Sequence, residues 1–243
     1  KKVLVTGASG FIGSTLIDRL LALGNYEVYA GVRAKSSRKY LQNSRIKFID
    51  LALSDPTALK QQLDREQFDC IFHFAGLTKA KRPEDFDKVN FGLTKNLADA
   101  INPQTTKLIF LSSFAAHGPA EEVNFSKAKV SDENKPNTAY GRSKLKAEEY
   151  INANFKGKYV ILRPTGVYGP RETDYFVFFQ TIDNHIEPYL GFVPQHLTFI
   201  YSKDLVEVCI KAFESDISGK TYFVSDGKMY LDSEYAAISK QVL

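Results

Sequence analysis

The sequence predicts an α/β protein built on a doubly wound parallel sheet, followed by a small C-terminal lobe. Short apolar segments rich in β-branched and aromatic residues alternate with segments whose apolar residues recur every three or four positions. Strands that alternate with helices require right-handed crossovers, which produce a parallel sheet covered by helices on both faces. A chain of 243 residues accommodates one large α/β domain with a small appendage.

The first region contains the repeated strand–helix pattern. The expected strands are residues 3–6, 28–32, 47–49, 70–74, 108–112 and 159–162. The expected helices are residues 11–23, 56–66, 83–101 and 139–152. In the first of these helices, Ile12, Leu16, Leu20 and Leu23 form one apolar stripe, which indicates a helix packed on the sheet.

The pattern changes after Pro170. We expect a helix at 172–185, a strand at 197–201, a helix at 204–214, a strand at 221–224 and a last helix at 232–243. We therefore divide the chain into residues 1–170, which carry the sheet, and residues 171–243, a lobe interwoven with it.

Composition and charge narrow the classes of function. The net charge of +4 is spread without a block of Lys and Arg, so we expect no nucleic-acid partner. We find no apolar run long enough to span a bilayer and no secretory leader, so we expect no membrane association. Cys70 and Cys209 are isolated from each other in sequence, which favours a reducing compartment, the cytoplasm, over a disulfide framework.

A glycine-rich turn joins the first strand to the first helix. Residues 6–13 read TGASGFIG, with glycines spaced Gly-x-x-Gly-x-x-Gly. Glycines let a pyrophosphate approach the backbone, and the helix N-terminus supplies unpaired N–H groups and positive potential. A structural turn has the same composition, but the strand before it and the helix after it favour a dinucleotide site.

Two further features carry chemistry. Tyr140 and Lys144 are four residues apart and share one helix face with Ala147 and Ile151. A lysine in this row either extends its ammonium to solvent or acts as a cation that lowers the pKa of the neighbouring phenol, and spacing alone does not separate the two. The strand 108–112 ends in Ser112 and Ser113, at the edge where α/β sheets bind ligands, although a serine also ends strands through local hydrogen bonds.

Together these residues resemble the extended short-chain dehydrogenase/reductases, also called the NAD-dependent epimerase/dehydratase family. The resemblance covers nearly the whole chain and implies a Rossmann-type doubly wound parallel sheet with a small C-terminal substrate lobe, which is incomplete here because family members usually continue further. The segments that carry it are 6–13, Asp50-Leu51, residues 73–76 (HFAG), Asn90, Ser112-Ser113, residues 140–144 (YGRSK), residues 162–164 (LRP), residues 167–170 (VYGP) and Asp204-Leu205.

The resemblance implies a role for each residue. Tyr140 is the expected general acid/base, Lys144 binds the nicotinamide ribose, and Ser113, preferred over Ser112 by its offset from the following Ala-rich turn, hydrogen-bonds the reacting oxygen. Asn90 and His73 are expected to be structural. The four histidines show no ligand spacing, so we expect no metal. The expected cofactor contacts are Gly7, Ser9, Gly10, Phe11, Ile12, Gly13, Arg33, Ser36, Asp50, Leu51, Ala75, Gly76, Tyr140, Lys144 and Pro164.

Departures from the family pattern narrow the reaction. Phe114, Ala115 and Ala116 follow the serine where dehydratases place acidic residues, which argues against dehydration. Gly166 stands where sugar-nucleotide members usually carry Asn. On this basis we expect hydride transfer between a nicotinamide and a secondary alcohol or ketone, with a sugar-nucleotide epimerase as the alternative. A non-catalytic dinucleotide sensor is a third reading, against which the intact Tyr140 and Lys144 argue.

The cofactor and assembly are also predicted. The end of the second expected strand carries Arg33, followed by Ser36, and no acidic residue. Arginine and serine can bind a 2′-phosphate, so we expect NADP in preference to NAD. The resemblance implies a homodimer formed through the helices at 83–101 and 139–152. The aromatic-rich segment 174–196 is expected to line a small-molecule pocket or to form a plain apolar core.

Overall fold

The computed structural model describes residues 1–119, 128–186 and 195–242. A seven-stranded sheet runs through the molecule in the order β10-β6-β5-β4-β1-β2-β3, and every neighbouring pair is parallel. Its strands are β1 (Lys2–Thr6), β2 (Glu27–Gly31), β3 (Lys47–Ile49), β4 (Cys70–His73), β5 (Lys107–Leu111), β6 (Tyr159–Pro164) and β10 (Lys220–Val224). This topology confirms the predicted doubly wound α/β class.

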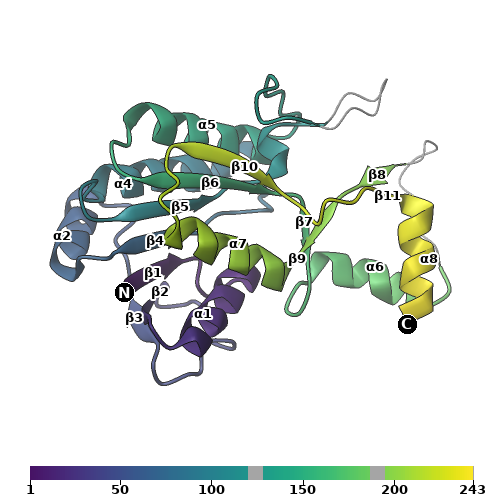
Figure 1. The fold of residues 1–243 in the computed structure, drawn as a ribbon, viewed down its shortest axis with the longest axis horizontal. Helices are drawn as coiled ribbons and strands as arrows, with labels where there is room; N and C mark the ends of the chain where they lie inside the picture. Colours follow the sequence, from purple (N-terminus) through teal and green to yellow (C-terminus); the bar gives the residue numbers. More distant parts are fainter. Residues whose placement is uncertain (120–127, 187–194, 243) are drawn as a thin grey trace.

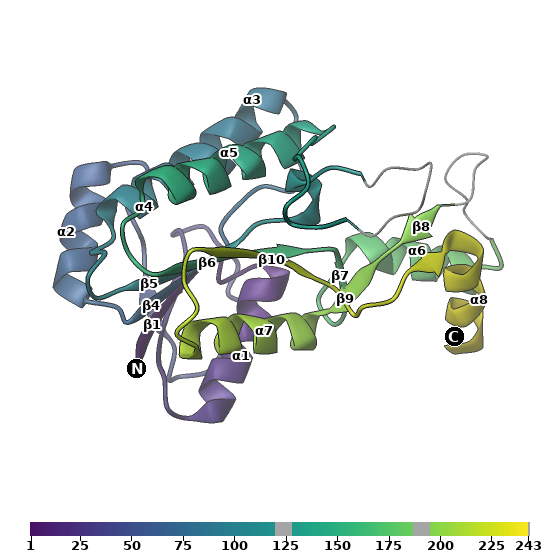
Figure 2. The same ribbon diagram turned by 45° about the horizontal axis from the view of Figure 1, so that its top comes forward.

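Helices cover both faces of the sheet (Figures 1 and 2). On one face, α1 (Phe11–Leu23) packs beside α7 (Ser202–Glu214), and their apolar sides close a core that includes Leu16 and Cys209. On the other face, α2 (Pro56–Glu66), α4 (Leu93–Ala100) and α5 (Ala139–Asn154) close a second core. Because helices cover both faces of the sheet, its central strands are buried on both sides, which explains their nearly continuous apolar residues in the sequence.

The expected helix at 83–101 is interrupted. A short α3 (Pro83–Phe86) leads into a π-helical segment, Asp87–Gly92, before α4 begins. Inside the segment, Asn90 is fully buried, and the Thr94 hydroxyl donates to its carbonyl oxygen at 2.6 Å. A π turn is often found at functional sites because it redirects side chains from the regular helical face. Here it turns the Asn90 amide toward the loop that follows β4.

The chain after Pro170 divides between the sheet and a projecting lobe. α7 and β10 return to the main sheet, whereas α6 (Asp174–Asp183) and α8 (Asp232–Val242) project beyond its carboxyl edge (Figure 1). Two small ladders connect the parts: β7 (Gly166–Tyr168) with β9 (Phe199–Tyr201), and β8 (His196–Leu197) with β11 (Tyr230–Leu231). The division of function at residue 170 stays a prediction.

Several predicted bounds in this lobe were wrong. The single strand expected at 197–201 is two short strands with different partners, β8 and β9. β7 and β11 were not predicted, because strands of two or three residues carry too little periodicity to be recognised. Tyr189 and Phe192, expected in the pocket, lie outside the described residues. Within the described ranges, no helix is long and apolar enough to cross a membrane.

Candidate active site

The glycine-rich turn lies between the end of β1 and the start of α1. Gly7 has a φ of +66°, and a β-carbon there would lie 2.7 Å from the carbonyl group of Phe74. A β-carbon at Gly13 would lie 2.3 Å from the Gly7 carbonyl oxygen. The turn therefore admits only glycine at both positions, and it lies directly against the loop after β4.

The start of α1 has the properties of a phosphate site. Its N-cap, Gly10, is exposed, no side chain caps the helix, and the first turn contains no acid. The N–H groups of Phe11 and Ile12 and the positive end of the helix are thus available to an anion. These residues, with the half-buried Ser9, fit the pyrophosphate of a dinucleotide.

The other expected cofactor residues lie along the same carboxyl edge. Arg33 is exposed just after β2, where its backbone N–H donates to the Ser36 hydroxyl at 3.1 Å. Asp50 and Leu51 follow β3, and the position of a β-carbon on Gly31 lies 3.2 Å from the Leu51 side chain. Pro164 ends β6 and is buried. Because all these strands are parallel, their ends meet at one edge of the sheet.

The predicted catalytic side chains meet at the ends of β5 and α5. The pKa of the half-buried Tyr140 phenol is raised by burial, and a hydrogen bond with the Ser113 side chain acts in the opposite direction. The Ser113 hydroxyl also accepts from the Ala115 backbone N–H at 3.2 Å, which starts a short 3₁₀ helix, Phe114–Ala116. Tyr140 is in the first turn of α5, which Thr138 caps by accepting from the Gly141 N–H.

Lys144 is held inside the protein, one helical turn beyond Tyr140. Its ammonium donates to the Leu111 carbonyl oxygen at 2.7 Å and lies 4.7 Å from the centre of the Phe110 ring. Burial lowers the pKa of Lys144 to about 8, and the nearby Glu148 carboxylate opposes that shift. A β-carbon on Gly76 would lie 3.7 Å from this ammonium, so the lysine approaches the loop after β4. The Lys144 ammonium therefore does not extend to solvent.

A second buried network separates the roles of the two adjacent serines. The Ser112 hydroxyl donates to Glu148, and the same carboxylate binds Arg163 through contacts of 2.6 and 3.0 Å. The Glu148 and Arg163 side chains are only 2% and 4% exposed, so the pair is a structural element of the core. Ser112 is thereby committed to the core, whereas Ser113 faces Tyr140.

A chain of hydrogen bonds connects the glycine-rich turn to α5. The Thr6 hydroxyl lies 2.7 Å from one His73 ring nitrogen, and Thr94 lies 2.9 Å from the other. Burial lowers the pKa of His73 to about 3, with a smaller contribution from the Lys144 charge, so the ring is neutral. Thr6 also accepts from the backbone N–H of Ala75, at 3.1 Å.

Asn90 completes the connection. Its amide binds the backbone of Leu77 in both directions and donates to the Ser143 hydroxyl at 3.0 Å. Ser143 in turn donates to the Tyr140 carbonyl oxygen at 2.7 Å. These hydrogen bonds therefore fix three parts relative to one another: the glycine-rich turn, the loop after β4 and the start of α5, where Tyr140 lies.

The comparisons with known proteins agree with this geometry. The model of the NAD dependent epimerase/dehydratase family matches residues 3–225. The chain belongs to this family. That finding confirms the resemblance seen in the sequence and the expectation of an enzyme.

Relatives and solved structures of this family share most of the chain. It is 27% identical to a UDP-glucose 4-epimerase of Vibrio cholerae, over 93% of this chain and 71% of that protein. It is 26% identical to a human dTDP-D-glucose 4,6-dehydratase, over 91% and 68% of the two chains. A UDP-glucuronic acid 4-epimerase from Bacillus cereus, solved with UDP-glucuronic acid and NAD, superposes with a TM-score of 0.84 at 25% identity, covering 100% of this chain and 83% of that one.

Gly166, which stands where sugar-nucleotide members usually carry Asn, is closely surrounded by aromatic side chains. A β-carbon there would lie 2.5 Å from the Tyr175 hydroxyl and 2.9 Å from the Phe199 ring. Tyr175 is in the first turn of α6, where the Glu172 carboxylate accepts from its backbone N–H at 2.7 Å. The sequence analysis included Tyr175 only as part of the aromatic-rich segment 174–196, since its position beside Gly166 depends on how the lobe folds. Among the described residues, no cluster of three metal-ligating side chains occurs.

Proposed function

We propose that the protein is a sugar-nucleotide epimerase that removes and returns a hydride at a secondary carbinol carbon. The observation that carries the proposal is that Ser113 lies beside the Tyr140 phenol, just after Leu111, whose carbonyl oxygen accepts from the buried Lys144 ammonium. All three are at the carboxyl edge of the sheet, adjacent to the turn that fits a pyrophosphate.

The protein residues divide the reaction between them. Tyr140 removes the proton from the substrate hydroxyl and returns it at the end of the cycle, and Ser113 hydrogen-bonds the same oxygen. Lys144 holds the nicotinamide ribose and adds positive charge near the phenol, which favours the phenolate. When bound, the nicotinamide would accept the hydride and give it back.

The position of Tyr175 favours the epimerase over the simple oxidoreductase, the two reactions considered from the sequence. The argument for a simple oxidoreductase was that Gly166 offers no side chain to hold a sugar nucleotide. In the structure, a phenolic hydroxyl occupies the place where a side chain at 166 would begin, so a polar contact is available from α6. The sugar-nucleotide epimerases among the relatives also favour the epimerase over the simple oxidoreductase.

A simple oxidoreductase acting on a secondary alcohol or ketone is the second candidate. The supporting observation is the apolar surface of α6, where Phe176 is 53% and Val177 60% exposed. Such a surface suits an apolar substrate. Dehydration is not proposed, because Phe114 stacks on His117 and the Phe114–Ala116 segment supplies no carboxylate.

One assay separates the candidates. The protein is incubated with UDP-, GDP- and dTDP-sugars, with NAD and NADP supplied separately, while epimers and reduced cofactor are both quantified. The epimerase predicts interconversion of a sugar pair without net cofactor reduction. Stoichiometric cofactor reduction with a ketone product would instead establish the oxidoreductase.

We further propose that NADP(H) binds more tightly than NAD(H). Arg33 is exposed at the end of β2, and the hydrogen bond from its backbone to Ser36 brings a hydroxyl to the same turn. A guanidinium and a hydroxyl suit a 2′-phosphate. NAD is the competing outcome, since the Bacillus cereus relative was solved with it.

We also propose an assembly and a location. The helices at 83–101 and 139–152 are proposed to form a homodimer interface. Cys70 and Cys209 are buried free thiols, which supports a reducing location such as the cytoplasm. Size-exclusion chromatography with light scattering tests the dimer.

A further inference from the structure

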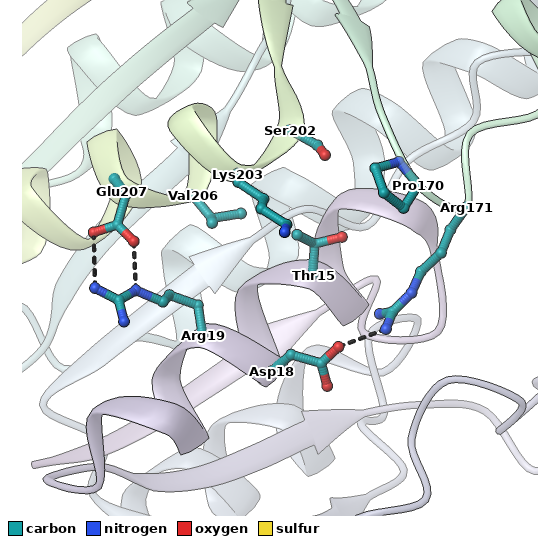
Figure 3. A pocket seen from close by; sticks show the side chains of 9 residues that line it. All are labelled: Thr15, Asp18, Arg19, Pro170, Arg171, Ser202, Lys203, Val206 and Glu207. Carbon is teal, nitrogen blue, oxygen red and sulfur yellow. Dashed lines mark hydrogen bonds and ion pairs between the residues drawn. The ribbon is translucent and has the colours of Figure 1, made fainter.

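A cavity of about 420 Å³ lies between α1 and α7, the two helices on the face of the sheet opposite α5 (Figure 3). The middle of α1 and the first two turns of α7 form its walls, and the loop containing Pro170 and Arg171 borders it. Thr15 is the fifth residue of α1, and Ser202 is the first residue of α7. The cavity contains none of the residues assigned to the reaction.

Two buried donors at this cavity have no protein partner among the described residues. Ser202 is fully buried, and its hydroxyl makes no hydrogen bond. The Arg171 Nη1 nitrogen is likewise buried and unpaired. In Figure 3 the Ser202 oxygen points toward the space beside Pro170 and Thr15. Buried donors without acceptors are rare in folded proteins, so both indicate a missing acceptor.

The electrostatics of the cavity favour an anion. Ser202 is the first residue of α7, a helix of 13 residues whose N-cap makes no side-chain hydrogen bond, although Asp204 in the same first turn offsets part of the positive potential of this helix end. Asp18 is paired with Arg171 at 2.5 Å, and Glu207 with Arg19. Lys203 is exposed and makes no ion pair within the described ranges, which leaves one positive charge in excess among the side chains that line the cavity.

The Arg171 guanidinium has a second contact besides Asp18. It lies 4.6 Å from the centre of the Tyr40 ring. The carboxylate and the ring together restrict the direction in which its unpaired nitrogen points.

We propose that this cavity binds a phosphoryl group, free or as a small phosphate ester, separately from the dinucleotide turn. Its oxygens accept from the Ser202 hydroxyl, Arg171 Nη1 and the backbone N–H groups at the start of α7, and Lys203 balances the remaining charge. A phosphoryl group offers enough acceptors for these donors at once.

The test is a titration of the full chain with inorganic phosphate, followed by amide NMR shifts that report each site separately. We expect saturable shifts at Ser202 and Lys203, which sodium chloride at matched ionic strength does not reproduce. Arg171→Gln and Ser202→Ala should each weaken binding about tenfold, as expected for a lost hydrogen bond to a charged group. Lys211→Gln, an exposed lysine in the last turn of α7 and outside this cavity, is the control.

A second variant should change the affinity for phosphate in the opposite direction. Asp18→Asn removes the carboxylate that competes for Arg171, so phosphate should bind several-fold more tightly. Damage to the fold does not produce tighter binding. A parallel titration with glycerol 3-phosphate shows whether an ester is preferred. Shifts confined to Phe11–Gly13, no shift at Ser202, or an unchanged affinity in Asp18→Asn would overturn the proposal.

Discussion

The sheet region and the projecting lobe are stabilised by different kinds of contact. In the sheet region, buried polar side chains are joined in series, as in the chain from Thr6 through His73 to Thr94. In the lobe, stacked rings make the contacts: Tyr235 lies 4.6 Å from Phe199 and 4.9 Å from Phe178, centre to centre. The Tyr235 hydroxyl is buried there with no partner among the described residues.

This difference matches the two tasks of the proposed enzyme. Hydrogen bonds are directional, and they fix the backbone at Tyr140 relative to the glycine-rich turn, as the proposed proton and hydride transfer would require. Ring contacts are less directional, so residues of the lobe can change while its packing mode is kept. We therefore propose that the first region carries the reaction chemistry and the second the choice of substrate.

The largest expected effect is on the chemistry at Tyr140. Tyr140→Phe removes only the phenolic oxygen, so turnover should fall by about 10²–10⁴-fold while cofactor binding is retained. Tyr150→Phe, on the same helix but outside the site, should keep full turnover. Steady-state kinetics and a cofactor titration make the measurement.

Lys144→Ala tests the two roles proposed for the lysine beside Tyr140. Because Lys144 is proposed to hold the ribose as well as to add charge, this variant should lose both turnover and cofactor affinity. Near-full activity of Tyr140→Phe, with any substrate that the wild type converts, would remove the general acid/base role.

The next effect is on stability in the sheet region. Glu148→Gln preserves shape but leaves the Arg163 guanidinium buried without its counter-ion, which should destabilise the protein by about 3–5 kcal/mol. The adjacent, exposed Glu149→Gln should change stability by less than about 0.5 kcal/mol. Urea unfolding of both variants is the measurement, and equal midpoints would mean that the pair contributes no net stability.

The Glu148 network also shows where sequence-based prediction ended. The turn at 6–13 was predicted because its spacing has a local meaning, whereas the roles of Tyr140 and Lys144 were predicted from the resemblance to the family. Glu148 is four residues beyond Lys144 on the same face, but charged helical residues are usually solvated, so burial was not expected. Its partner is in β6, and only the assembled sheet brings the two together.

The π-helical segment and the contact between Gly166 and Tyr175 were not predicted, for similar reasons. A π turn keeps the helical apolar pattern, so residues 83–101 read as one helix. The contact between Gly166 and Tyr175 joins β7 to α6, and the identity of a glycine does not indicate which side chain occupies the adjacent space.

A smaller effect is expected at the cofactor edge. Arg33→Ala should weaken NADP(H) binding about tenfold and leave NAD(H) binding within about twofold, because only the 2′-phosphate meets the guanidinium. Arg45→Ala, also exposed but at the far end of the same connection between β2 and β3, is the control. Fluorescence titration with both cofactors decides the matter, and tighter binding of NAD(H) to the wild type would reverse the proposed preference.

The smallest effect compares one tyrosine from each region. The Tyr26 hydroxyl in the sheet region donates to Glu214 at 2.5 Å, so Tyr26→Phe loses a hydrogen bond and should destabilise by about 1 kcal/mol. The Tyr235 hydroxyl has no partner to lose, so Tyr235→Phe should be neutral or stabilising by up to about 1 kcal/mol. The substitution is the same in both cases, which cancels the difference in side-chain volume. Urea unfolding measures the pair, and amide exchange at Ala236 shows whether the lobe itself responds. A loss of stability in Tyr235→Phe as large as that in Tyr26→Phe would show that the lobe, too, depends on directional bonds.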